Sequence, residues 1–420
     1  MDNYSNSERS SRLQIPVNDK NVVTELSGDF ILPDYQPEIK RLLRVGAVVL
    51  PPSKYISDRE AELAGNVDYY VFYTGIDNAP YCAPLTAEYK INMPLDYDAD
   101  EDGFLNSPGC SVAILPDMIS GRVTAPRKIN IKCRLKSRVQ VFGEIPVEDG
   151  YSQGEDGLQV LRGEMSASKY LRGAGDVWRV SDEIICDSRD GDIRVVSAEG
   201  RTLLSEVTAI ENGVVCRGDL YLKLMLCRED EGVPYALMRK IPISGNVSVD
   251  GAKVGDSACA KGSVCELNVT VEDGRIGIDA GVLAEAQVAH SEAIRYVKDV
   301  YTASRKSENE YKTVGIPTDA ICFGGNFTLS DSLSLGDAGI APGARIIDAA
   351  GVASVDEYSF DGGKCTMSGK AKFWVLTEKD GEFGIGEMEL PFSYKMPMEG
   401  KLSRAMCECE VISVRARADG

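Results

Sequence analysis

One pattern recurs three times along this chain and limits the folds it can adopt. Each copy starts with a basic residue and two aliphatic residues, and a glycine that opens an apolar run follows the arginine 24 positions later. An acidic turn and a second run ending near a proline come next. Such self-similarity indicates an array of structural units. The arginine and glycine pairs are Arg41 and Gly65, Arg194 and Gly218, and Arg345 and Gly369.

The second half of the pattern repeats with the same period. Arg127 matches Arg275, and Tyr151 matches Tyr301, which lies 150 positions later. A period of about 150 residues gives the 420-residue chain nearly three units. The predicted organisation is a disordered segment at 1–13 followed by units at 14–148, 149–298 and 299–420.

The runs predict strands. Most alternate apolar and polar residues or stay apolar for about eight positions, and Gly, Asp and Pro separate them, which is typical of all-β proteins. Residues 281–305 are rich in Ala and Glu and favour a helix by propensity. Their counterpart in the first unit alternates like a strand, so we expect a strand in the first half. The predicted fold is a tandem of β-sandwich or barrel-like repeats with few short helices.

The third unit is incomplete. In the second unit, residues 265–274 lead through a turn at Gly274 into a long strand, whereas the matching residues 407–420 reach Gly420 and stop. Either the natural chain continues, or another segment or molecule supplies the strand. An open strand edge invites pairing with another chain, so self-association there is one expectation.

Charge and cysteine use exclude several classes of partner. The net charge of -19 disfavours nucleic acid, whose binding needs clustered Lys and Arg. No run of about 18 apolar residues predicts a membrane span, and the polar N-terminus lacks the apolar core of a signal peptide, which indicates an intracellular protein. The twelve dispersed cysteines form no CxxC, so free thiols are expected, with Cys407 and Cys409 on one strand face.

Nothing in the sequence predicts catalysis. His290 is the only histidine and has no nucleophile motif beside it, which indicates a structural role. No cofactor motif occurs. The predicted protein is therefore not an enzyme and has no cofactor.

One acidic stretch resembles the start of a calcium loop. Asp98, Asp100 and Asp102 precede Gly103 with the spacing of ligands 1, 3 and 5, but the twelfth position is Gly109 and not Glu. A solvated acidic turn is the alternative, so these three residues are a calcium candidate only and no metal site is predicted.

The repeat arginines have two interpretations. They can close each unit by pairing with a carboxylate or by capping carbonyls, or they can be exposed anchors for a partner. The prolines at 33 and 37 cannot donate to a central ladder, so the stretch 32–38 is expected to be a structural joint at a strand end.

The motif Leu-Pro-Asp-x-x-Pro-Glu-Ile at 32–39, with YKINMPLD at 89–96 and APRKINIKCRL at 125–135, resembles the SPOCS domain of spore-coat-associated proteins from clostridia and other Firmicutes. The resemblance extends from about residue 14 to the end and is strongest in the first unit. It implies a non-catalytic module of spore-envelope assembly in the mother-cell cytoplasm and spore coat. Coat proteins such as the coat-assembly ATPase are the implied partners. The residues expected to contact them are Asp34, Pro37, Glu38, Ile39 and Arg41.

The sequence departs from the family in one respect and leaves one other class open. No LysM module, with which well-known members finish, is visible. The alternative function is a carbohydrate- or surface-binding β-sandwich protein that uses calcium. Only 7% of the residues are aromatic and only Trp178 and Trp374 are tryptophans, which disfavours sugar stacking.

Overall fold

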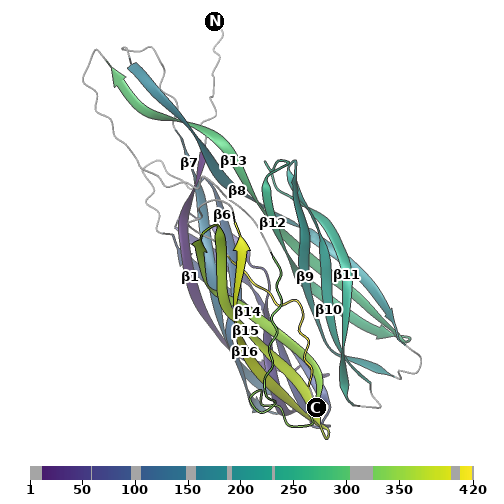
Figure 1. The fold of residues 1–420 in the computed structure, drawn as a ribbon. Helices are drawn as coiled ribbons and strands as arrows, with labels where there is room; N and C mark the ends of the chain where they lie inside the picture. Colours follow the sequence, from purple (N-terminus) through teal and green to yellow (C-terminus); the bar gives the residue numbers. More distant parts are fainter. Residues whose placement is uncertain are drawn as a thin grey trace.

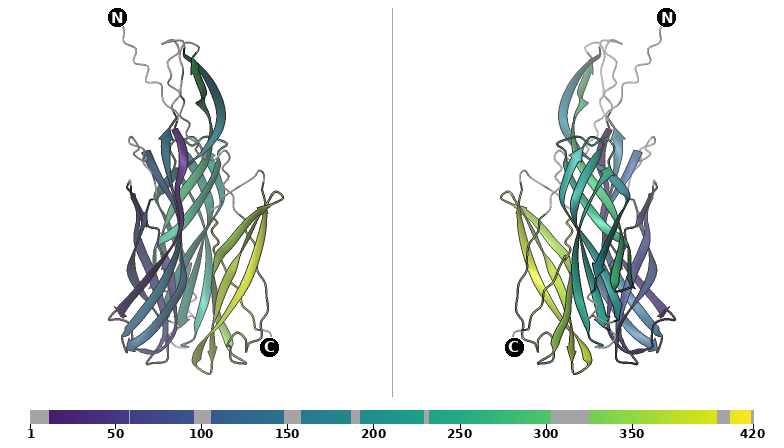
Figure 2. Two further views of the ribbon diagram at one scale, coloured as in Figure 1. Left: turned by 90° about the vertical axis from the view of Figure 1, so that its left-hand side faces the viewer. Right: turned by 90° about the vertical axis from the view of Figure 1, so that its right-hand side faces the viewer.

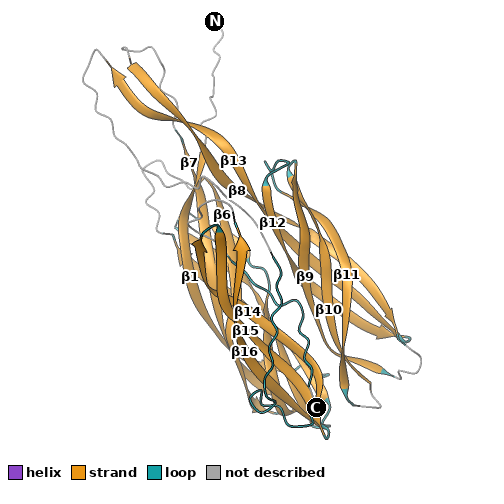
Figure 3. Cartoon of the chain, viewed as in Figure 1, coloured by secondary structure: helices purple, strands orange, loops and turns teal. Residues whose placement is uncertain are grey.

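The structure is a computed structural model that describes residues 12–57, 59–95, 106–147, 158–186, 192–228, 232–302, 325–398 and 407–418. These residues form antiparallel strands and no helix (Figures 1 and 3), so the predicted all-β fold is confirmed. None of the five sheets in this part of the chain closes into a barrel. The described residues also contain no helix able to cross a membrane. Most of the predicted N-terminal segment lies outside the described residues, and the unit boundaries stay predictions.

Two facing sheets form the first unit. One has the order β1-β7-β6, and in the other the long strand β4 pairs with β2, β3 and β5. Their inner residues form one hydrophobic core, in which Tyr69, Tyr73 and Leu135 are almost completely buried. The strands are β1 (Arg12–Ile31), β2 (Ile39–Val49), β3 (Ser53–Ile56), β4 (Glu60–Gly75), β5 (Pro80–Pro94), β6 (Asn106–Ala125) and β7 (Lys128–Pro146).

The second unit repeats this architecture. Its sheets have the orders β12-β13-β8 and β11-β10-β9, so β13 takes the central place of β7 and β10 that of β4. Leucines at alternate positions of β10 meet Ile276 and Ile278 of β13 in the core. The strands are β8 (Leu158–Ile185), β9 (Ile193–Ile210), β10 (Gly213–Arg228), β11 (Pro234–Ser248), β12 (Ser257–Glu272) and β13 (Arg275–Thr302).

The third unit contains one sheet in the described residues. Its order, β14-β15-β16, matches β9-β10-β11. Residues 325–334 and 407–418 flank this sheet in sequence and belong to no strand. The strands are β14 (Arg345–Asp361), β15 (Lys364–Lys379) and β16 (Glu382–Pro397).

Strand β13 shows which of the two predictions for residues 281–305 is correct, the helix favoured by propensity or the strand favoured by the repeat. It is extended from Arg275 to Thr302, and its pairing with β8 continues to Leu158. The strand predicted for the first half of 281–305 is confirmed, and the second half is also strand as far as Thr302. Pairing with β8 overrides the helix propensity of Ala and Glu. The far end of this strand pair extends beyond the sandwich at the top of Figure 1.

The three units close into a ring. Contacts join β5 to β9, β11 to β14, and β16 to β2, so the same kind of strand meets the same kind of strand at each step. The units lie side by side with their strands along a common direction (Figure 2). A hydrophobic cluster, here called the ring core, lies among them. It takes the seventh residue after each repeat glycine (Phe72, Met225 and Leu376) and the second after each repeat arginine (Leu43, Val196 and Ile347).

Candidate functional site

The opening motif is a joint built around one arginine. The Arg127 guanidinium donates hydrogen bonds to the carbonyl oxygens of Pro33 at 2.7 Å and Gln36 at 2.8 Å. The backbone amide of Leu32 donates to the Arg127 carbonyl at 3.0 Å, which ties the end of β1 to the turn before β7. Because a guanidinium offers several donors in a fixed plane, it holds the carbonyls of the turn together. The expected joint at 32–38 is thus present.

A buried tyrosine completes the joint. The Tyr73 hydroxyl donates to the Gln36 side-chain oxygen at 2.9 Å and to the Pro37 carbonyl at 3.0 Å. Burial is the main cause that raises the pKa of Tyr73 above its ordinary value, so the hydroxyl stays a donor at neutral pH. The sequence analysis did not assign a role to Gln36 or Tyr73. Their partners include backbone carbonyls, which carry no sequence signal.

The motif separates buried from exposed residues. Leu32 and Ile39 are 1% and 8% exposed and belong to the core. Asp34, Tyr35 and Glu38 point to solvent from the turn between them. These three residues, here called the joint rim, form a rigidly held polar and aromatic surface. Of the five predicted contact residues, Asp34 and Glu38 lie on this rim, Pro37 is half-buried, and Ile39 is in the core.

The fifth, Arg41, lies at a contact between units. Its guanidinium donates to the Phe383 carbonyl of the third unit at 3.3 Å, and Glu382 is 3.8 Å away. Arg194 makes the equivalent bond to the Pro80 carbonyl of the first unit at 3.1 Å and lies over the Tyr81 ring. Two repeat arginines therefore cap a carbonyl of the neighbouring unit.

Arg345 has the same place in the third unit but is exposed. No hydrogen bond or ion pair of its side chain occurs among the described residues. The carbonyl equivalent to that of Pro80 belongs to Pro234, at the start of β11. The contact between the second and third units uses different residues.

The repeat glycines lie where strands approach closely. A Cβ on Gly218 would lie 2.0 Å from the Leu203 carbonyl oxygen, and one on Gly369 would lie 2.0 Å from that of Ser354. At Gly65 the nearest atom is the Tyr89 hydroxyl oxygen, 2.8 Å away. The repeated glycine is a packing requirement, because β10 and β15 have a register shift against the neighbouring strand there.

Two further contacts of charged side chains join the third unit to the others. Lys223 donates to Asp348 at 2.7 Å, with side chains 15% and 12% exposed. The Arg44 guanidinium lies 3.3 Å from the Trp374 ring centroid. Burial lowers the pKa of Arg44 to about 10, although Glu199 and Glu387 oppose the shift. The two contacts use equivalent positions of the repeat. Arg44 and Asp348 are each the third residue after a repeat arginine, and Trp374 and Lys223 are each the fifth residue after a repeat glycine.

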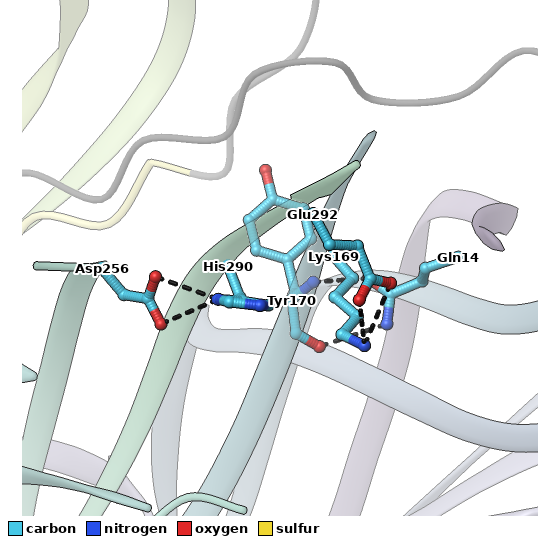
Figure 4. A network of polar contacts seen from close by, with 6 residues as sticks. All are labelled: Gln14, Lys169, Tyr170, Asp256, His290 and Glu292. Carbon is cyan, nitrogen blue, oxygen red and sulfur yellow. Dashed lines mark hydrogen bonds and ion pairs between the residues drawn. The ribbon is translucent and has the colours of Figure 1, made fainter. Parts of the chain in front are cut away.

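His290 is buried in the second unit. Its Nδ1 lies 3.0 Å from both carboxylate oxygens of Asp256. Figure 4 shows this pair beside the Lys169–Glu292 ion pair. The hydroxyl of Ser291, the next residue in the chain, lies 2.9 Å from the hydroxyl of Ser166. These contacts are those of a structural histidine held by a carboxylate.

Asp98, Asp100 and Asp102 lie outside the described residues. Within the described residues, no three His, Cys, Asp or Glu side chains cluster as metal ligands.

Most of the thiols in the described ranges are poorly suited to nucleophilic chemistry. The eleven cysteines in the described ranges are free, and six of them are buried. Burial raises the pKa of Cys216 to about 11 and that of Cys407 to about 11. Because the thiolate is the nucleophile, a raised pKa keeps these groups unreactive at neutral pH. The alternation at the last described segment places Cys407 and Cys409 on one side, with Glu408 and Glu410 exposed on the other.

A cavity of about 2560 Å³ lies between the units. Arginine side chains lie over several of the aromatic rings that line this cavity. Arg172 lies 4.6 Å from the Phe142 ring centroid, and Arg138 lies 5.4 Å from that of Tyr358. Rings covered by guanidinium groups leave little free face for sugar stacking.

Comparison with protein families gives one match. The family model described as SipL, SPOCS domain, matches residues 193–272, which contain β9 to β12 of the second unit. The predicted resemblance to the SPOCS domain is therefore confirmed. Searches of curated proteins and of solved structures give no match.

Proposed function

Because the chain carries a SPOCS domain, we propose that it is a non-catalytic adaptor in spore-envelope assembly that binds coat morphogenetic proteins through its β units. The SPOCS family points to a role in sporulation and is not a known family of enzymes. The site of action in this proposal is the mother-cell side of the forespore and the spore coat. The coat-assembly ATPase is the first partner to test.

The rigid joint rim is the observation that carries the proposal. Arg127, Gln36 and Tyr73 fix the backbone of the turn, while Asp34, Tyr35 and Glu38 project from it. A preorganised surface loses little conformational entropy on binding. Tyrosine offers a large contact area with few rotatable bonds, which makes Tyr35 the central residue of the proposed contact.

Carbohydrate binding has less support. Three of the aromatic rings that line the central cavity, those of Phe142, Tyr170 and Tyr358, lie beneath arginines, and the exposed joint rim carries Asp34 and Glu38. A sugar would have to displace the guanidinium groups from the rings.

The test is binding of the purified coat-assembly ATPase to the immobilised chain. The joint variant replaces Asp34, Tyr35 and Glu38 with alanine. The control variant makes the same kinds of change at exposed Tyr55, Glu211 and Asp250. We expect the intact chain and the control to bind equally and the joint variant to bind at least tenfold more weakly. The same three proteins, used as bait in extracts of sporulating cells, should differ in the same way in recovery of coat proteins. Equal recovery by all three would remove the joint rim from the proposal.

A further inference from the structure

Two free thiols of the third unit lie against each other. Cys365 is the second residue of β15, and Cys407 belongs to the segment 407–418. Although they are far apart in the sequence, their side chains are hydrogen-bonded to each other. Cys365 is 0% exposed, whereas Cys407 is only half-buried. One sulfur atom is therefore held inside the unit, and the other is within reach of solvent.

The repeat shows that packing does not require a thiol at the inner position. The residue four positions before each repeat glycine is Ala61, Val214 or Cys365, and all three are 0% exposed. In the second unit, Val214 shares a hydrophobic cluster with Ala258 and Ala260 of β12. Aliphatic side chains therefore fill this position in the first two units. The third unit has a thiol there, and this thiol meets a second one.

Both thiols are held in place by the fold. The backbone of β15 pairs with β14 on one side of the first thiol and with β16 on the other. Beside the second thiol, Glu408 pairs with Lys261 of the second unit, and Glu410 lies 3.5 Å from Arg201 of the same unit. The entropy loss of bringing two thiols together therefore occurs on folding, which favours a reaction between them.

We propose that Cys365 and Cys407 form a modification site, at which an external disulfide converts the two thiols into a disulfide bond within the chain. Reducing cytoplasm keeps such a pair as thiols, and oxidising surroundings preserve the bond. The bond closes a loop that contains β16, which contacts β2 of the first unit, and it ties β15 to a segment held by the second unit. Oxidation therefore restrains the third unit against the other two. This inference goes beyond the adaptor function and does not depend on it.

The reaction consists of two exchange steps. The Cys407 thiolate attacks one sulfur atom of a low-molecular-weight disulfide such as glutathione disulfide, which forms a mixed disulfide and releases one glutathione thiolate. The Cys365 thiolate then attacks the Cys407 sulfur and displaces the second glutathione. The two protons that leave the cysteines are taken up by the two glutathione molecules. The protein loses two electrons, and the external disulfide gains them.

The surroundings of the two thiols set the order and the rate of these steps. Cys407 reacts first because it is the more exposed. Burial raises its pKa to about 11, the neighbouring Cys365 adds to this shift, and Arg138 opposes it. Because the thiolate is the attacking species, exchange is slow at neutral pH and faster at about pH 9. The test is therefore made under alkaline conditions.

The first experiment oxidises the full chain with glutathione disulfide at about pH 9. The remaining thiols are alkylated, and the tryptic peptides are identified by mass spectrometry. We expect the peptide 365–370 linked to the peptide 405–415, and dithiothreitol should separate them. Oxidation of the chain unfolded in urea should give at least tenfold less of this link, because its twelve cysteines then have no fixed neighbours. A folded chain without the link, or chains joined to one another through Cys407, would overturn the proposal.

Three variants assign the bond within the linked peptides, because the peptide 405–415 also contains Cys409. Cys409→Ala should leave the link unchanged, and Cys407→Ala should abolish it. Cys365→Ala should abolish it as well and still fold, because the first unit has Ala61 at this position. A link that survives Cys407→Ala, or that is lost in Cys409→Ala, would identify the wrong partner and contradict the proposal.

Thermal unfolding tests the consequence for the ring. The oxidised chain should unfold at a higher temperature than the reduced chain, because the closed loop restricts the unfolded state. Hydrogen exchange at the backbone amides of 407–418 should also slow. Neither change should occur in the Cys407→Ala variant after the same treatment. A linked chain that unfolds and exchanges like the reduced chain would show that the bond does not restrain the third unit.

Discussion

Lys223 of the second unit and Asp348 of the third form an ion pair of 2.7 Å that is largely shielded from solvent. Replacing Asp348 with Asn should lower the free energy of unfolding by about 3 kcal/mol, because it leaves a buried ammonium without its counter-ion. Urea denaturation followed by tryptophan fluorescence measures the loss. The double variant Lys223→Met with Asp348→Leu should recover most of the stability. If the single variant were as stable as the original chain, the pair would contribute nothing to the ring.

Arg127 should be irreplaceable by lysine. Arg127→Ala removes hydrogen bonds from a charged donor to two well-placed carbonyls, and a loss of about 2–3 kcal/mol in unfolding free energy is expected. Arg127→Lys should lose nearly as much, since an ammonium cannot reproduce the planar set of donors. Hydrogen exchange should also accelerate at the backbone amides of Leu32 and Ile39. The exposed Arg122 on β6, changed to Ala, is the control and should alter neither quantity.

The repeat glycines should differ in their tolerance of a methyl group. Gly218→Ala and Gly369→Ala place Cβ against a backbone carbonyl and should each destabilise the chain by about 1–3 kcal/mol. Gly65→Ala meets the hydroxyl end of the Tyr89 side chain, which can move, so its effect should be smaller. Thermal unfolding of the three variants ranks their stabilities. A Gly65 variant less stable than the other two would contradict the packing argument.

Stability should fall at alkaline pH through the buried thiols. Burial raises the pKa of Cys216 from 9.0 to about 11, so the unfolded chain loses this proton first. The contribution is complete below pH 9 and is lost as pH rises to about 11, by up to about 1.4 kcal/mol per pH unit. Cys216→Ala should therefore be less stable than the original chain at pH 7 and should approach it by pH 11. Urea titrations at several pH values test this convergence.

Most of the fold could be predicted from the repeat in the sequence. It predicted strand for the first half of 281–305 against the local propensity, because a residue that aligns with a strand in one unit has the same neighbours in the next. The spacing of Arg41 and Gly65 also anticipated a shared structural role. The role itself required the structure, since the acceptor of the Arg41 hydrogen bond is a backbone carbonyl.

The ring could not be predicted from the repeat alone. The first two units each have their own core, so alternation explains the inner residues Leu222 and Leu224 but does not explain the outer face. One signal was present in the run Leu224 to Cys227, which is apolar at every position. A strand that is buried on both faces has this pattern. In the structure Met225 and Cys227 lie in the ring core.

The ring also sets a limit on how the array can grow. Each unit uses one side to contact the unit before it and another to contact the unit after it, and the third unit returns to the first through Arg41 and Arg44. A duplicated unit inserted into this chain would have to break one of these contacts before it could join. Changes in valency should therefore come from whole rings, each bringing one joint rim.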